Sequence, residues 1–300
     1  MIVILGPTAS GKTRLAVRLA KEMKSEIISA DSRQVYRGMD IGTGKDLKDY
    51  IVDGVAVPYH LIDIVDPDYE FNVFEYQQRF FKCFSEVYSR GVIPVMVGGT
   101  GLYIESVIMG YRMMEVPEYS DFREELEKED MQTLTKRLLN VDPKVHNTTD
   151  LLDRKRIIRA IEIREFTKLH ANENGCSFPI IIPLIIGVRW ERSILRRRIT
   201  SRLQERLNSG IIEEVINLND SGIAWDKLNF FGLEYRYVGL YLQGRMSYND
   251  MFKKLNTRIH QFAKKQETWF RRMEKRGIQI HWINGEDSDS IGDIVKYLVK

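Results

Sequence analysis

One eight-residue segment limits what this chain can fold into more than any other: Gly6-Pro-Thr-Ala-Ser-Gly-Lys-Thr13. The apolar run Ile2 to Leu5 precedes it, as a short buried strand would, and residues 12–23 follow with the apolar spacing of an amphipathic helix. A glycine-rich loop in this setting turns backbone N–H groups toward an anion at the positive end of the helix. The segment therefore predicts a cradle for a di- or triphosphate, formed by Gly6, Pro7, Thr8, Ala9, Ser10, Gly11, Lys12 and Thr13.

Two side chains of this loop can bind phosphate groups or a metal ion. Lys12 supplies a mobile positive charge for the phosphate groups. The hydroxyl of Thr13 is an oxygen ligand of the kind that Mg²⁺ prefers. We therefore expect Mg²⁺ as the cofactor and Thr13 as its ligand from the protein.

Apolar runs alternate with helical periodicity along most of the chain, which is typical of a parallel sheet with helices on both faces. We therefore predict an α/β fold of the P-loop type. The expected strands are residues 2–5, 26–30, 59–65, 92–97, 180–188 and 278–283. The expected helices of this part are residues 12–23, 74–88, 191–209 and 248–272.

A stretch in the middle of the chain breaks this alternation. It carries helical patterns at residues 119–130 and 151–169 and has no convincing strand. We interpret residues 113–186 as a helical insertion in a catalytic core formed by residues 1–112 and 187–300.

Polar residues follow two of the expected strands. Asp31 comes directly after the second strand, and the strand that includes Ile93 to Val97 ends in Gly-Gly-Thr100 without a carboxylate. Because the carboxyl ends of parallel strands share one sheet edge with the phosphate loop, Asp31 and Thr100 are expected beside its ligand. The residues alone leave Asp31 open as a Mg²⁺ ligand or as a general base.

Charge is distributed unevenly. The chain has a net charge of +3, yet residues 187–276 contain 19 Lys and Arg against 10 Asp and Glu. A basic segment of this kind favours a polyanionic partner or, more simply, a solvated helical surface. There is no run of about 18 apolar residues, so we expect no membrane span. Cys83 and Cys176 match no metal-site spacing, which fits a reducing cytoplasm.

Six further blocks of sequence stand out beside the phosphate loop. They are Ile28-Ser-Ala-Asp-Ser-Arg-Gln-Val-Tyr36-Arg-Gly-Met-Asp-Ile-Gly-Thr43, Pro58-Tyr-His-Leu-Ile-Asp63, Val97-Gly-Gly-Thr-Gly-Leu-Tyr103, Arg156-Ile-Ile-Arg-Ala-Ile-Glu162, Arg198-Ile-Thr-Ser-Arg202 and Lys265-Gln-Glu-Thr-Trp-Phe-Arg271. Together with the loop, these blocks resemble the tRNA dimethylallyltransferase family, also called tRNA isopentenyltransferases or IPP transferases. The resemblance covers nearly the whole chain.

The resemblance implies that the loop holds the diphosphate of dimethylallyl diphosphate. The exocyclic amine of an adenosine next to the tRNA anticodon then attacks the allylic carbon, and pyrophosphate leaves. By the same resemblance, Asp31 orients the amine and accepts its proton. Lys12, Thr13 with Mg²⁺, and Arg202 stabilise the leaving diphosphate. Arg202 lies beside an apolar helical stripe of Leu195, Ile199, Leu203 and Leu207.

The resemblance also implies which residues contact the anticodon arm of tRNA. Those at the sheet edge receive a flipped adenine, and those in the helical insertion contact the backbone. Arg156 and Arg159 are three residues apart, so a helix places them on one face. The expected tRNA-binding residues are Asp31, Ser32, Arg33, Gln34, Thr100, Arg123, Lys155, Arg156 and Arg159.

One block departs from the family pattern. Members usually have Arg-x-x-Gly-Tyr before the last helices, whereas this chain has Phe231 and Glu234 in place of the arginine and the glycine. An acid there could repel an RNA phosphate. The alternatives kept open are an ATP-dependent nucleotide or nucleoside kinase, prenylation of a free adenine nucleotide, and a tRNA-binding paralogue that has lost catalysis. We expect a cytoplasmic monomer.

Overall fold

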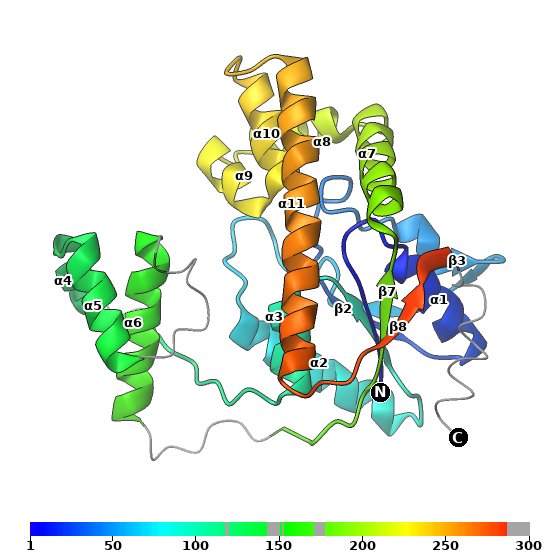
Figure 1. Cartoon of the computed structure of the whole chain (residues 1–300), viewed down its shortest axis with the longest axis horizontal. Helices are drawn as coiled ribbons and strands as arrows, with labels where there is room; N and C mark the ends of the chain where they lie inside the picture. Colours follow the sequence, from blue (N-terminus) through cyan, green and yellow to red (C-terminus); the bar gives the residue numbers. More distant parts are fainter. Residues whose placement is uncertain (118–119, 143–150, 152, 171–177, 287–300) are drawn as a thin grey trace. The chain divides into compact units, whose positions relative to one another are not determined.

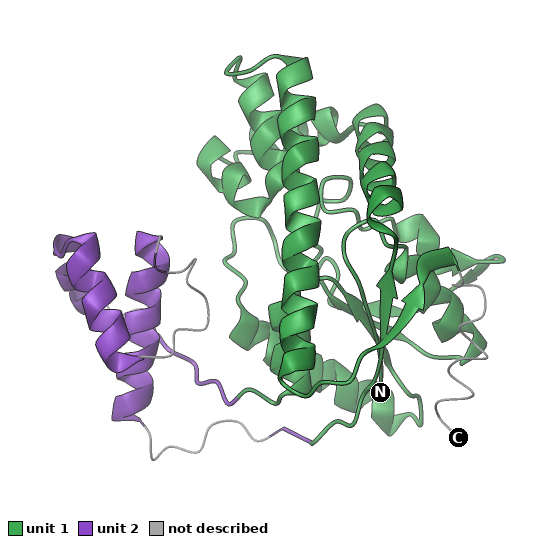
Figure 2. Cartoon of the chain, viewed as in Figure 1, with its two compact units in different colours: residues 1–111, 180–300 green, residues 112–179 purple. Residues whose placement is uncertain are grey.

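The structure is a computed structural model and describes residues 1–117, 120–142, 151, 153–170 and 178–286 (Figure 1). Cys176 lies outside the described residues. The chain divides into two compact units, the first formed by residues 1–111 and 180–300 and the second by residues 112–179 (Figure 2). The second unit ends earlier than the expected boundary at residue 186, because Leu184 already belongs to a strand of the first unit.

A six-stranded sheet forms the centre of the first unit, and every pairing in it is parallel. The strand order is β5-β2-β6-β1-β7-β8. This arrangement confirms the predicted α/β class. The strands are β1 (Ile2–Leu5), β2 (Ile27–Ala30), β5 (Tyr59–His60), β6 (Val95–Gly98), β7 (Leu184–Arg189) and β8 (His281–Asn284).

Helices cover both faces of this sheet. Helix α1 packs on the face that carries Ile2, Ile4, Ile186 and Val188, in one apolar cluster. Because side chains alternate along a strand, Gly187 faces the other way, where Trp282 meets Phe270 of α11. The helices of the first unit are α1 (Lys12–Glu22), α2 (Val73–Ser89), α3 (Gly101–Ile108), α7 (Arg192–Asn208), α8 (Ile211–Asp220), α9 (Trp225–Phe231), α10 (Leu233–Leu242) and α11 (Tyr248–Lys275).

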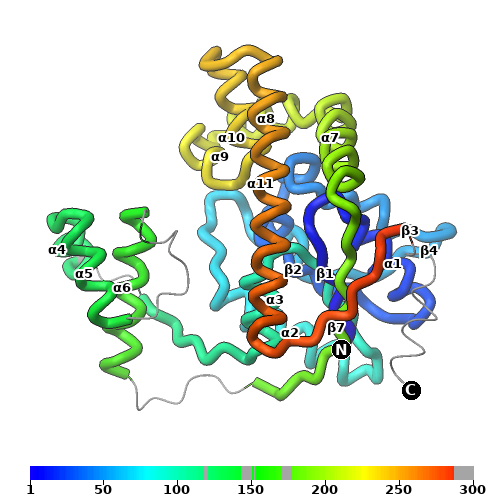
Figure 3. The backbone as a smooth tube through the Cα atoms, viewed as in Figure 1, coloured from blue at the N-terminus to red at the C-terminus, as the bar shows by residue number. Residues whose placement is uncertain are grey.

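Smaller elements complete this unit. A 3₁₀ turn at Leu47–Tyr50 leads into an antiparallel hairpin of β3 (Ile51–Val52) and β4 (Val55–Ala56). The backbone tube shows β7 leading almost directly into α7 (Figure 3). This connection places the start of α7, an arginine-rich helix, at the carboxyl edge of the sheet, where β7 ends.

The second unit is helical in its described residues, with α4 (Ser120–Lys128), α5 (Met131–Val141) and α6 (Arg154–Leu169). These three helices share an apolar core of their own. The buried members of that core are Leu126, Leu134, Leu138, Ile157, Ile158 and Ile161.

Five of the six expected strands are shorter than predicted, and α3, α5, α8, α9 and α10 match no helix range predicted from the sequence. The strand expected at residues 59–65 ends at His60, because Leu61 and Asp63 have positive φ angles that no strand permits. The strand expected at residues 92–97 begins at Val95, directly after Pro94, which has no N–H to donate. Helix α3 was not predicted, because its consecutive buried residues 103–107 show no helical period.

Candidate active site

The phosphate loop connects β1 to α1. Gly11 caps α1 with a φ of 88°, and Ala9 also has a positive φ, of 61°. Gly6 is needed for close approach, since a Cβ there would lie 2.8 Å from both Ser10 Oγ and the carbonyl oxygen of Val188. The loop is thus shaped by the glycines that the sequence pattern requires, at the amino end of a helix.

Side chains from distant parts of the chain hold this loop from outside. Trp190 donates its indole N–H to the Ser10 carbonyl at 2.8 Å, and Arg198 Nε donates to the Ala9 carbonyl at 2.9 Å. The Arg198 guanidinium also stacks over the Trp190 ring, 4.2 Å from its centroid. The sequence prediction missed both residues as loop contacts, although Arg198 begins one of the blocks that resemble the family.

Lys12 lies within the cradle and is surrounded by charge of both signs. Its ammonium has a pKa lowered to about 8, mainly by burial. Arg202 and Arg206 contribute to this lowering, whereas Asp31 and Asp46 oppose it. A bound diphosphate would favour the charged form of Lys12 and would therefore raise this pKa.

Asp31 and Thr100 meet at the carboxyl edge of the sheet, as the sequence predicted. Thr100 Oγ1 accepts a hydrogen bond from the Ser32 amide at 3.0 Å, and the Thr100 amide donates to the Ala30 carbonyl at 3.2 Å. Asp31 Oδ1 accepts from the Arg33 amide at 2.9 Å. These bonds join the ends of β2 and β6 into one polar turn beside the loop.

The segment after Asp31 folds back on itself. Gln34 is 8% exposed; its amide accepts from Ser29 Oγ at 3.3 Å and donates to the Gly44 carbonyl at 3.0 Å. The Gln34 side chain therefore supports this segment from inside. Arg33 instead places its guanidinium over the ring of Phe230, at 4.9 Å, and half of Phe230 is exposed.

Arg202 extends from the edge of the buried stripe of α7, as predicted, and its guanidinium contacts the segment that contains Gly44 and Asp46. It pairs with the Asp46 carboxylate and donates to the Gly44 carbonyl at 3.4 Å. Burial opposes ionisation of Asp46, but Arg202 and Arg206 outweigh it and lower the pKa of this carboxyl. In this structure Arg202 thus binds the carboxylate of Asp46, whose charge also acts on Lys12.

Of the two departures from the family pattern, Phe231 is buried and Glu234 is half-buried. Phe231 is 1% exposed and packs edge-on against Tyr36, with ring centroids 4.8 Å apart. Glu234 pairs with Arg206 at 3.3 Å, and burial raises the pKa of its carboxyl despite that arginine. Glu234 therefore faces a cation inside the protein, which removes the expected repulsion of an RNA phosphate.

Two of the arginines expected to contact tRNA are engaged within the second unit. Arg123 donates two hydrogen bonds to the fully buried carboxylate of Glu162, at 2.8 and 2.7 Å. Arg159 pairs with the same carboxylate at 3.1 Å and donates to the Val116 carbonyl at 2.6 Å. Their guanidinium groups compensate a buried charge, which gives both residues a role in the fold of this unit.

Lys155 and Arg156 have a different setting. Both are exposed at the start of α6, and Arg156 lies 3.7 Å from Asp153 in a surface ion pair. A cation in such a pair remains accessible to a phosphate, because exposed pairs contribute little energy.

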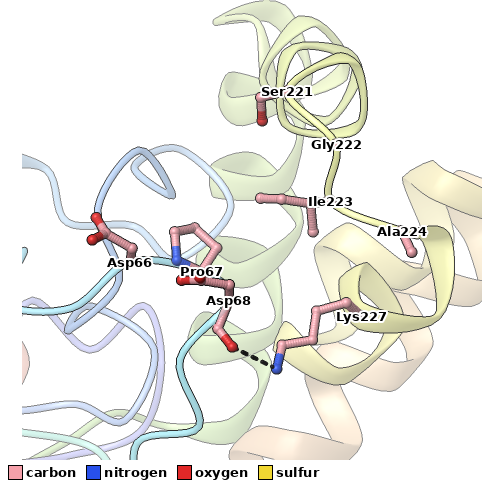
Figure 4. A pocket seen from close by; sticks show the side chains of 8 residues that line it. All are labelled: Asp66, Pro67, Asp68, Ser221, Gly222, Ile223, Ala224 and Lys227. Atoms are coloured by element: carbon pink, nitrogen blue, oxygen red, sulfur yellow. Dashed lines mark hydrogen bonds between the residues drawn. The ribbon is translucent and has the colours of Figure 1, made fainter.

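A hollow of about 560 Å³ lies between the loop at Asp66–Asp68 and the segment from Ser221 to Lys227 (Figure 4). Lys227 crosses it and donates to the Asp68 carbonyl at 3.3 Å. None of the predicted site residues lines this hollow, so the candidate active site remains the sheet edge.

Within the described part of the chain, no helix is both long enough and apolar enough to cross a bilayer.

Comparison with known families places the chain clearly. The pattern of the family described as IPP transferase matches residues 34–273, and that of isopentenyl transferase matches residues 1–55. A tRNA dimethylallyltransferase 1 from Syntrophus aciditrophicus is 61% identical over 296 residues, which cover 99% of this chain and 97% of the relative.

Solved structures agree with these matches. A tRNA isopentenylpyrophosphate transferase from Bacillus halodurans is 33% identical with a TM-score of 0.70, over 98% of this chain and 95% of that protein. A eukaryotic dimethylallyltransferase that acts on tRNA shares the fold at 23% identity, with a TM-score of 0.78 over 95% of this chain and 73% of that protein.

Proposed function

The chain belongs to the IPP transferase family, and we propose that it transfers a dimethylallyl group from dimethylallyl diphosphate to tRNA. The acceptor is the exocyclic amine of the adenosine adjacent to the anticodon, and pyrophosphate is released. The observation that carries this proposal is the meeting of the phosphate loop, Asp31 and Thr100 at one sheet edge.

The loop is the proposed site of the donor. Its amides and Lys12 would bind the diphosphate, and their positive charge becomes more favourable as negative charge grows on the leaving group. Arg202 is proposed to add a second cation, since its guanidinium binds the carboxylate of Asp46 and can bind diphosphate oxygens in the same manner.

Asp31 is the proposed general base. The lone pair of the adenine amine is delocalised into the ring, so the amine is a weak nucleophile. A carboxylate that accepts a hydrogen bond from this amine orients it and takes its proton as the new C–N bond forms. Ser32, Thr100 and the neighbouring turn would surround the flipped base.

Mg²⁺ is the proposed cofactor. The half-buried Thr13 offers a hydroxyl oxygen next to Lys12 at the start of α1, a ligand of the class that Mg²⁺ binds together with phosphate oxygens. When bound, the ion supplies charge that stabilises the departing diphosphate.

The remaining tRNA contacts are proposed at two places. Arg33 lies at the sheet edge, and Lys155 and Arg156 are exposed on the helical unit. Arg123 and Arg159 are proposed to act indirectly, through the fold of α4 and α6. We also propose a cytoplasmic enzyme, since its proposed substrate tRNA is used there, and a monomer, since one chain carries all of these residues.

One experiment tests the function directly. The protein is mixed with unmodified tRNA, Mg²⁺ and dimethylallyl diphosphate labelled in the allyl group, and the labelled nucleotide is located after digestion. Label on the adenosine next to the anticodon is expected. Release of phosphate from ATP without transfer of label would favour the kinase alternative, and binding of tRNA without transfer would favour a catalytically inactive paralogue.

A further inference from the structure

One polar side chain lies in the otherwise apolar buried stripe of helix α11. The apolar members of that stripe are Met251, Leu255, Ile259, Ala263, Phe270 and Met273. Gln266 lies in this stripe between Ala263 and Phe270, at helical spacing from both, and is 8% exposed. A buried amide costs free energy unless it is hydrogen-bonded, so its partners indicate what it does there.

Both ends of the Gln266 amide are hydrogen-bonded to the candidate active site. Its Oε1 accepts from the Thr8 amide of the phosphate loop at 2.8 Å. Its Nε2 donates to the carbonyl oxygen of Gly99, directly before Thr100, at 2.9 Å. One partner is a donor and the other an acceptor, so the amide fits in a single orientation.

The packing around Gln266 is close. A Cβ on Gly99 would lie 2.5 Å from Gln266 Nε2, and a Cβ on Gly101 would lie 2.2 Å from Trp269 of the same helix. The same position of Gly99 approaches Lys12 Cε to 3.5 Å. The two glycines therefore let α11 approach the turn that carries Thr100, next to the lysine of the cradle.

Contacts other than Gln266 also hold α11 in place. Arg272 and Arg276 both donate to the fully buried carboxylate of Glu105 on α3, at 2.6 and 2.5 Å. The helix is thus fixed to α3 independently of Gln266, and loss of the amide would leave it seated.

We propose that Gln266 is a positioning residue that sets the spacing between the donor and acceptor halves of the active site. The inference rests on the proposed prenyl transfer. Thr8 belongs to the loop proposed for the diphosphate, and Gly99 to the turn proposed for the adenine, so one amide joins the two reactants' sites. Transfer rates fall steeply when reacting groups are misplaced by about 1 Å, which is the kind of error this link prevents.

The test is Gln266→Met, which keeps the length of the side chain and removes both hydrogen bonds. We expect kcat for transfer to fall about 10- to 100-fold, with KM for dimethylallyl diphosphate and for tRNA changed less than about threefold. Arg276→Ala is the matched control, because it weakens the seat of α11 on α3 without touching either half of the site.

The outcomes separate this inference from the proposed function. An inactive wild-type protein would contradict the proposed function itself. An active wild type with an unchanged kcat in Gln266→Met would overturn the positioning role. So would an equal loss of kcat in Arg276→Ala at the same loss of melting temperature, because the effect would then be structural.

Discussion

Asp31 has two roles that a single substitution can confuse. Its carboxylate accepts a backbone hydrogen bond from Arg33, and it is also the proposed base. Replacement by asparagine keeps an oxygen that can accept the backbone bond but removes the basic group. The two functions can therefore be measured separately at this one position.

We expect Asp31→Asn to lower kcat by about 100-fold, the scale of a lost general base, while dimethylallyl diphosphate binds as before. Single-turnover transfer and calorimetric binding of the donor are the measurements. Normal turnover in this variant would remove Asp31 from proton transfer and leave it only a structural role.

The ionisation of Lys12 predicts how donor binding depends on pH. Its pKa is about 8 in the ligand-free protein. Lys12 is therefore a charged ammonium below pH 8 and loses this charge as the pH rises through that value. Affinity for pyrophosphate should therefore be full at pH 6.5 and should decline above pH 8. Calorimetry across this range measures it, and Lys12→Arg, which stays charged, should abolish the decline.

Arg202 is tested against an arginine on the same helix. Arg202→Ala should lower kcat/KM for the donor by about 100-fold, comparable to removing one preorganised donor from a transition-state site. Arg197 is exposed on α7 and serves as the control, since Arg197→Ala should change little. Equal effects of the two substitutions would point to general surface charge.

Among the elements, α6 carries side chains that stabilise the second unit and side chains that are proposed to bind tRNA. Its apolar side chains Ile157, Ile158 and Ile161 pack against α4 and α5, and Glu162 adds a buried carboxylate to the same face. Lys155 and Arg156 at its amino end are exposed. Substitutions on α6 and its partner Arg123 should therefore separate stability from tRNA affinity.

Arg123→Ala should destabilise the protein by about 2 kcal/mol, below the ~3–5 kcal/mol typical of a buried pair that loses its only partner, because Arg159 still faces Glu162. Arg156→Ala should change stability by less than about 0.5 kcal/mol. It should instead weaken tRNA binding and reduce the salt dependence by about one phosphate contact. Thermal melts measure the stability, and filter binding at several salt concentrations measures the tRNA affinity. A stable Arg123→Ala variant, or an Arg156→Ala variant with unchanged tRNA affinity, would contradict these assignments.

On the scale of the whole molecule, donor binding should stabilise the folded chain. A ligand at 100 times its Kd adds about 2.7 kcal/mol to the free energy of unfolding when it binds only the folded state. We expect pyrophosphate with Mg²⁺ to raise the melting temperature, and Lys12→Ala to reduce that rise. An equal rise in both proteins would place the anion outside the cradle.

Much of this site could be predicted from local sequence. The phosphate loop was recognisable because its glycines and Lys12 must lie at fixed spacing between a strand and a helix. Asp31 and Thr100 were placed together because the carboxyl ends of parallel strands meet at one edge. The buried stripe of α7 and the edge position of Arg202 followed from helical periodicity.

Tertiary structure alone decided which distant side chains complete the site. Gln266 lies 258 residues from Thr8, and Arg202 lies 156 residues from Asp46, so no local pattern relates them. Glu162 likewise takes up Arg123 and Arg159, which the sequence presented as cations for RNA. The sequence alone determined the cradle and the sheet edge because their geometry is set by neighbouring residues. The partners of the buried charges and amides depend on how helices pack, which only the folded chain establishes.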